Sequence, residues 1–160
     1  MFRTDGGRIV YGGGGIRPDV FSRPDTFTTA ERNFVRALGA KVPVYRDVLA
    51  SYALEVKAAG KLQPSFTVTE AMVDEVLRRL RSKGAELPAD VLTGARSLVA
   101  QEFSYELSRY VFGRGAEFRR RLGDDAQIQS ALGLLRRART PQELLTLATA
   151  ERGGTRNNQD

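Results

Sequence analysis

Apolar side chains recur at spacings of three and four residues over most of the chain, starting near residue 28. This is the period of an amphipathic helix, in which one stripe faces a core and the rest faces water. Glycine and proline interrupt the pattern at short intervals, so it predicts about six helices joined by short links. The longest of them is expected to run from Pro88 to about Phe112. We therefore predict a mainly α fold.

Two of the expected helices begin with a capping box, Thr28-Thr-Ala-Glu31 and Thr140-Pro-Gln-Glu143. In this motif the threonine hydroxyl accepts from a free backbone N–H of the first turn, and the glutamate reaches back to the cap. Gly39 and Gly60 follow the last apolar positions of two expected helices. A left-handed glycine ends a helix without a steric penalty, so we expect both to act as stops.

The first residues follow a different pattern. Arg3 to Val20 reads as two short strands around a glycine-rich turn, followed by an extended connector. A two-stranded hairpin by itself is marginal in water, so we expect it to belong to a larger sheet. The predicted organisation is a small N-terminal β-hairpin with its connector (residues 1–27), a helical domain (28–152) and a disordered polar tail (153–160).

Composition narrows the chemistry. The 160 residues are enough for one domain, and they include no His and no Cys. Disulfides, Ser–His and Cys–His nucleophile pairs and the preferred ligands of zinc are therefore excluded. No apolar run reaches the ~20 residues that a membrane-spanning helix needs. We expect no metal site, no cofactor and no membrane span in this chain.

The net charge is +6, and arginine supplies most of the positive charge. Arginine clusters occur at residues 78–81, 119–121 and 136–139. A basic surface can bind nucleic acid, whereas arginines on a solvated helix face cover apolar surface with their stems. We favour the second interpretation because no nucleic-acid-binding motif accompanies the charge.

The consecutive glycines from Gly12 to Gly15 raise the question of a phosphate-binding loop, because exposed backbone N–H groups bind anions. The Walker pattern continues with Gly-Lys-Ser/Thr into a helix, but here Ile-Arg-Pro follows. Pro18 also removes a donor and disfavours helix at Arg17. We therefore predict that these glycines serve a turn or bulge that needs positive φ.

Two acidic pairs are candidates for chemistry in the helical part. Asp124 and Asp125 precede an expected helix, where carboxylates satisfy free N–H groups, so capping is favoured over general acid–base catalysis. Glu102 and Glu106 lie one helical turn apart like half of a di-metal site, but the histidines that such sites use are absent. We expect these glutamates to pair with Arg109 or with a neighbouring arginine cluster.

A Ser–Lys nucleophile pair is still open as a hydrolytic arrangement. The lysines stand at expected helix starts, ends or links, where amines are solvated and not buried. They are Lys41, Lys57, Lys61 and Lys83. The sequence therefore does not single out a catalytic serine.

The N-terminal segment contains Thr4-x-x-Gly7-Arg8-x-Val10-Tyr11, then Gly13-Gly14-Gly15-Ile16 and Pro18-Asp19-Val20. This run resembles the last hairpin of the protease domain in carboxyl-terminal processing peptidases (tail-specific proteases). The resemblance continues more loosely to the end of the chain. It includes Phe66-Thr-Val-Thr69 and then Phe118, Asp125, Gln127, Ala131, Leu134 and Leu135. The matching hairpin residues are expected to be structural.

Members of that family cleave polypeptides near their C-termini with a serine nucleophile and a lysine general base, and they are usually exported to the periplasm or cell envelope. The resemblance implies that the catalytic dyad lies upstream of the hairpin, so no catalytic residue is carried over to this chain. It implies a helical region that packs on the parent protease domain, shapes the access of polypeptide substrate or mediates self-association. The alternative is a free-standing basic helical module that binds a protein or nucleic acid.

Overall fold

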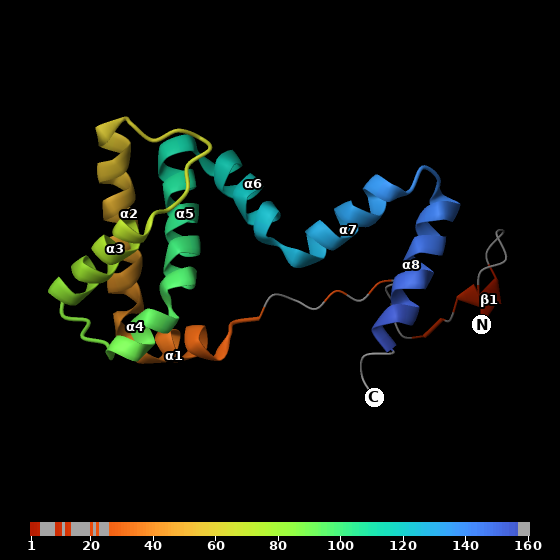
Figure 1. Cartoon of the computed structure of the whole chain (residues 1–160), viewed down its shortest axis with the longest axis horizontal. Helices are drawn as coiled ribbons and strands as arrows, with labels where there is room; N and C mark the ends of the chain where they lie inside the picture. The colour runs from red at the N-terminus through yellow and green to blue at the C-terminus, as the bar shows by residue number, and fades with distance from the viewer. Residues whose placement is uncertain (4–8, 11, 14–19, 21, 23–25, 157–160) are drawn as a thin grey trace. The chain divides into compact units, whose positions relative to one another are not determined.

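The computed structural model describes residues 1–3, 9–10, 12–13, 20, 22 and 26–156. It is mainly helical with a small N-terminal hairpin, as the sequence predicts (Figure 1). The chain forms two compact units, and each is described here by itself. The central unit is Asp25–Asp125, and the terminal unit combines Met1–Pro24 with Ala126–Asp160. The last two helices thus group with the N-terminal segment and not with the other helices.

The central unit is built on two long helices, which lie side by side and run in the same direction (Figure 1). These are α2 (Val42–Ala59) and α5 (Arg96–Phe112), and α3 (Glu70–Ser82) packs against both. Where they begin, α1 (Thr29–Leu38) packs on α4 (Ala89–Gly94), and a 3-10 turn, Gly39–Lys41, joins α1 to α2. After α5 comes α6 (Arg114–Asp124), which packs against it.

A continuous apolar core fills the space between these helices. Phe103 is fully buried at its centre and stacks on Tyr52, with ring centroids 4.8 Å apart. The buried members come from α1, α2, α3 and α5 and the links between them: Phe34, Leu38, Tyr45, Val48, Leu49, Ala53, Val73, Val76, Leu77, Leu80, Ala85, Ala95, Leu98, Val99, Phe103 and Leu107. The apolar stripes read from the sequence face this core.

The predicted helix ends are confirmed where local chemistry determines them. The Glu31 N–H donates to the Thr28 hydroxyl at 3.2 Å, and the Thr28 N–H donates to the Glu31 carboxylate at 2.6 Å, which completes the capping box. Gly39 and Gly60 both take positive φ values, 47° and 67°, which favour glycine. Gly60 is left-handed as expected, whereas Gly39, with ψ at −121°, ends α1 in a different conformation.

The single helix expected from Pro88 to Phe112 is wrong, because the chain breaks at Ala95 into α4 and α5. The physical reason is packing between helices. A Cβ added at Gly94 would lie 2.8 Å from the Ala30 Cβ, so the glycine lets α4 approach α1 closely. That contact turns α4 away from the direction of α5.

The terminal unit holds the hairpin and two helices. Strand β1 (Phe2–Arg3) pairs antiparallel with β2 (Ile9–Val10), with Phe2 opposite Val10. After the central unit the chain forms α7 (Ala126–Arg137) and α8 (Pro141–Arg156). Among the described residues of this unit, Leu134 and Ala148 are the buried apolar side chains.

Helix α8 begins as its capping motif predicts, with the Glu143 N–H donating to the Thr140 hydroxyl at 3.2 Å. The Glu143 carboxylate in turn accepts from the Arg139 N–H at 2.7 Å. The helix continues through Arg156, four residues into the segment expected to be a disordered tail. Extending an existing helix fixes one residue per hydrogen bond gained, and no proline interrupts it here.

Candidate functional site

The hairpin residues that carry the family resemblance are described only in part. Val10 lies in β2, and Gly13 has a φ of 99°, which confirms the predicted positive φ at this one glycine of the run. The other site residues of the motif lie outside the described residues. They are Gly7, Arg8, Tyr11, Gly14, Gly15, Ile16, Pro18 and Asp19.

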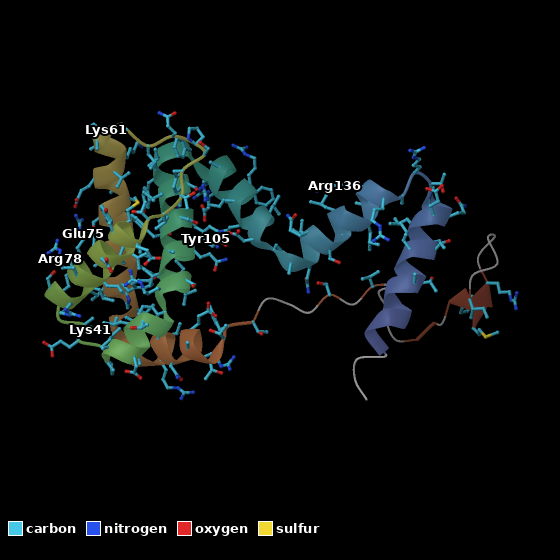
Figure 2. The ribbon with its side chains drawn as sticks, viewed as in Figure 1. Lys41, Lys61, Glu75, Arg78, Tyr105 and Arg136 are labelled. Carbon is cyan, nitrogen blue, oxygen red and sulfur yellow. The ribbon has the colours of Figure 1, made fainter. Side chains whose placement is uncertain are left out.

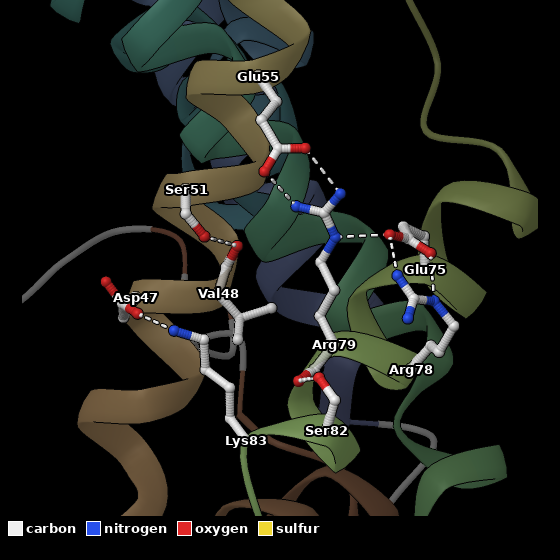
Figure 3. A network of polar contacts seen from close by, with 9 residues as sticks. All are labelled: Asp47, Val48, Ser51, Glu55, Glu75, Arg78, Arg79, Ser82 and Lys83. Atoms are coloured by element: carbon white, nitrogen blue, oxygen red, sulfur yellow. Dashed lines mark hydrogen bonds and ion pairs between the residues drawn. The ribbon is translucent and has the colours of Figure 1, made fainter.

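Many of the arginines join helices to one another. Between α2 and α3, the Arg79 guanidinium donates to Glu55 at 2.7 Å and to Glu75 at 2.6 Å (Figure 3). It also lies over the Tyr52 ring, 4.3 Å from the centroid. Hydrogen bonds from Arg78 and Arg79 lower the pKa of Glu75 to about 2. This part of the cluster at residues 78–81 is therefore structural.

The cluster at residues 119–121 covers aromatic rings in the same way. Arg120 lies 4.1 Å from the centroid of Phe66, and Arg121 lies 4.1 Å from that of Tyr105. Arg121 also pairs with Glu117 at 2.9 Å. Ring faces and carboxylates thus hold these cations, which supports a solvated helix face over a phosphate-binding surface.

The lysines lie at the surface, as expected, with Lys41 and Lys61 at opposite ends of α2 (Figure 2). The buried serines are engaged elsewhere: Ser104 donates to the Gln101 carbonyl at 2.7 Å, and Ser108 donates to the Ser104 carbonyl at 2.8 Å. No hydrogen bond joins a serine to a lysine in the part of the chain that the structure describes.

Asp124 has a role that the sequence did not reveal. It ends α6, and its carboxylate accepts from the Tyr105 hydroxyl at 2.9 Å. Burial, together with this hydrogen bond and the charge of Asp124, raises the pKa of Tyr105 to about 12. Figure 2 shows Tyr105 on α5. Asp124 therefore locks α6 onto α5 and does not cap the next helix, whereas Asp125 directly precedes α7.

A groove of about 880 Å³ lies in the central unit between α1, α2 and α5, and we call it the α1–α2–α5 groove. Phe27 and Val35 are at its edge, with 50% and 40% of their surface exposed. Its apolar lining includes Phe34, Leu38, Val42, Leu49 and Leu98. Its polar lining includes Tyr45, Arg46, Asp47, Gln101, Glu102, Tyr105, Glu106, Arg109 and Arg121.

Tyr45 lines this groove from α2, and only 4% of its surface is exposed. Its ring meets Phe34 edge to face, with centroids 5.5 Å apart. Its hydroxyl is buried and has no hydrogen-bond partner of ideal geometry among the described residues. Burial raises the pKa of Tyr45 far above its ordinary value, and the charge of the neighbouring Glu102 carboxylate and a side-chain hydrogen bond to it act in the same direction. The hydroxyl therefore lies against Glu102, which is the acceptor next to it.

Glu102 and Glu106 line the same groove from α5, and both are half-buried. The expected ion pairs with Arg109 or an arginine cluster do not form in the described structure. The charges of Arg109 and of Arg121, in the cluster at residues 119–121, nevertheless act on Glu106. The Arg109 guanidinium lies instead near the Tyr110 ring, 5.6 Å from its centroid. Burial raises the pKa of Glu106, and the positive charge of Arg109 opposes this shift only in part.

The sequence alone does not show that Tyr45, Glu102 and Glu106 lie in one groove. Tyr45 stands in the apolar stripe of its helix and looks like an ordinary core residue, while Glu102 is far away in the chain. The available signal was that Glu102 and Glu106 interrupt an otherwise apolar stripe one turn apart. Among the described residues, no group of three or more carboxylates gathers closely enough to hold a metal ion.

The terminal unit has a groove of its own, about 680 Å³ in volume, between α7 and α8. Its lining is mostly apolar and includes Leu134, Leu135, Leu144 and Leu145. It contains no charged side chain from the described residues. This groove therefore offers mainly apolar contact, with Ser22, Gln127 and Ser130 as the polar residues of its lining.

Comparisons with family models, curated proteins and solved structures found no match. Among the described residues, no helix combines the length and the apolar character that crossing a membrane requires.

Proposed function

We propose that this chain is a non-catalytic helical region of a carboxyl-terminal processing serine peptidase. We further propose that it binds polypeptide, in the α1–α2–α5 groove of its central unit. One observation carries the binding role. The groove places the half-buried carboxylates of Glu102 and Glu106, neither of which forms an ion pair in the described structure, beside the Tyr45 hydroxyl and among apolar walls. A polypeptide offers both apolar side chains and hydrogen-bonding groups, so it suits such a site.

The link to a peptidase depends on the hairpin sequence. The antiparallel pairing of Phe2–Arg3 with Ile9–Val10 is compatible with a segment that resembles the last hairpin of a protease sheet. On this proposal the serine and lysine of a parent hydrolase lie outside this chain, and the helical region presents bound polypeptide to it. The parent would be exported, as members of the resembled family are.

Nucleic acid is the less favoured ligand. Phosphate groups would meet the Glu102 and Glu106 carboxylates in the groove, and like charges repel. Outside the groove, Arg78, Arg79 and Arg96 already pair with glutamates or aspartates. Binding by counterion release needs arginines that are free to contact phosphates.

The binding role is tested by titrating the full chain into a fluorescently labelled, permanently unfolded protein and measuring anisotropy. Val35→Glu places a charge at the groove edge and is expected to weaken binding about tenfold or more, because an apolar contact becomes a buried charge. Leu54→Glu is the matched control, since Leu54 is an apolar α2 residue with 48% of its surface exposed and is not part of the groove lining.

Absence of binding by the unchanged chain, or equal weakening by both substitutions, would contradict the binding role. The non-catalytic role is checked with the same labelled protein. No cleavage is expected, and a robust rate that one serine substitution abolishes would overturn it.

A further inference from the structure

We infer that the exposed face of α6 docks the chain on the surface of a membrane that contains anionic lipids. Phe118 enters the apolar layer of this membrane, and Arg114 and Arg119 bind lipid phosphates. These three residues lie outside the lining of the α1–α2–α5 groove, so the inference does not depend on polypeptide binding there.

The first step is the exposed ring of Phe118. Among the described residues of the central unit it is the most exposed large apolar side chain, with 62% of its surface accessible. It lines neither of the two grooves described above, so the ring projects from the helix. A single exposed apolar side chain is common on protein surfaces, and the groups around it therefore decide what it means.

The second step is the positive charge on both sides of this ring. Arg114 lies one helical turn before Phe118, and Arg119 flanks the ring from the other side of the helix face. Both arginines are exposed, and neither forms an ion pair or a ring contact in the described part of the chain. They differ in this from Arg120 and Arg121, which lie over aromatic rings. Arg114 and Arg119 are therefore free to bind phosphates.

The third step is the position of the negative charges of α6, which packs against α5 (Figure 1). Glu117 pairs with Arg121, whose guanidinium covers the Tyr105 ring of α5. Asp124 accepts from the Tyr105 hydroxyl. Between Glu106 and Glu117 the chain contains no carboxylate. The acidic side chains of α6 thus lie towards α5, and its exposed face is apolar in the middle and positive on both sides.

The fourth step is the choice of partner. An anionic membrane offers phosphates at its surface and an apolar layer below them, which matches arginines beside an exposed ring. Proteins that bind single-stranded nucleic acid use a groove with several stacking rings, whereas this face has one projecting ring. A folded partner would need a preformed pocket for the ring, and a lipid layer adapts to it.

The test uses the absence of tryptophan from the chain, because Phe118→Trp then gives a fluorescence signal from this position alone. The full chain is mixed with phosphatidylcholine vesicles that contain roughly 30% phosphatidylglycerol. The emission is expected to be that of a water-exposed indole in the free chain. With the vesicles it should shift to the blue, and lipids with brominated acyl chains should quench it. Val35→Trp, at a position on α1 with 40% of its surface exposed, is the matched control and should show neither change.

The charge is tested in the Phe118→Trp chain by adding Arg114→Gln and Arg119→Gln together. This pair is expected to weaken binding to the anionic vesicles about tenfold or more, because each basic side chain near such a surface adds roughly fivefold. Arg36→Gln with Arg81→Gln removes the same charge at exposed arginines outside α6 and should change binding less than about twofold.

Four results would overturn the inference. Equal binding to anionic and to pure phosphatidylcholine vesicles, or to neither, would contradict docking by charge. A blue-shifted emission of the Phe118→Trp chain without vesicles would mean that the ring is already covered. Equal weakening by the two arginine pairs would indicate attraction by net charge alone. A shift caused by polyglutamate or single-stranded DNA, and not by vesicles, would assign the face to a polyanion.

Flotation of the unchanged chain with the same two kinds of vesicle needs no substitution, so it decides even if a variant fails to fold. Flotation with the anionic vesicles alone is the expected result. None of these outcomes alters the groove proposal, which is tested with the labelled unfolded protein.

Discussion

The central and terminal units use apolar side chains in different ways. In the central unit, residues from α1 to α5 close around Phe103 into a continuous core. In the described part of the terminal unit, α7 and α8 bury Leu134 and Ala148 and leave Leu135 and Leu145 largely exposed beside a groove. The central unit buries its apolar stripes against one another, whereas the described part of the terminal unit leaves part of its apolar surface exposed.

Because of this difference, an unusual side chain says more about function in the central unit than in the terminal unit. An exposed leucine in a thinly packed helix pair has an ordinary cause, because two helices alone bury little surface. Half-buried carboxylates among the apolar walls of a well-packed unit, as at Glu102 and Glu106, do not have that cause. The groove of the central unit is therefore more informative about binding than the apolar face of α7 and α8.

The largest expected effect is on stability. Phe103→Ala removes a fully buried ring that stacks on Tyr52, and it is expected to lower the free energy of unfolding of the central unit by about 3–5 kcal/mol. Leu134→Ala, in the open α7–α8 pair, is expected to cost only about 2 kcal/mol, the lower end of the range for leucine. Urea denaturation, followed by the near-ultraviolet signal of the tyrosines at positions 45, 52, 105 and 110, measures the first, and amide hydrogen exchange of α7 and α8 measures the second.

If Phe103→Ala and Leu134→Ala lowered the free energy of unfolding equally, the difference in packing between the two units would be contradicted. A loss of central-unit signal on Leu134→Ala would do the same, because it would mean that the two units unfold as one. The expected result is a destabilised α7–α8 pair beside an unchanged central unit, seen as faster amide exchange confined to α7 and α8.

The smaller effect concerns the ion pairs that Glu75 makes with Arg78 and Arg79 within α3. The pKa of Glu75 lies near 2 in the folded chain, below its ordinary value of 4.5, so its ionised form stabilises the fold. This contribution is complete above about pH 4.5 and is lost as the pH falls towards about 2. Glu75→Gln should therefore lower the thermal midpoint slightly at pH 6, and the difference should shrink and vanish in acid.

Glu86→Gln is the matched control, because Glu86 is an exposed glutamate without an ion pair in the described structure. A difference between the Glu75→Gln variant and the unchanged chain that stays constant from pH 6 to the acid limit would contradict the role given to Arg78 and Arg79.

Features set by neighbouring residues could be predicted from the sequence. Such features depend on residues within one helical turn. They include the mainly helical class, the capping boxes at Thr28 and Thr140 and the positive φ of the glycines at positions 39 and 60. The break at Ala95 could not be predicted, because it depends on the contact between Gly94 and Ala30.

The candidate site was beyond sequence reasoning for the same reason. Glu102 and Glu106 were identified as an anomaly in an apolar stripe, but the absence of any ion pair became visible only when the arginines were placed. Tyr45 comes to the same groove from a different helix, and its contact with Glu102 is a property of the packed unit. The spacing of apolar residues along the chain does not indicate this contact.

The most direct test of the account is amide hydrogen exchange of the full chain with and without the permanently unfolded protein. The account predicts slower exchange in α1, α2 and α5, which form the groove, and no change in α7 and α8. Protection confined to α7 and α8, or spread evenly along the chain, would contradict the assignment of the binding site to the central unit.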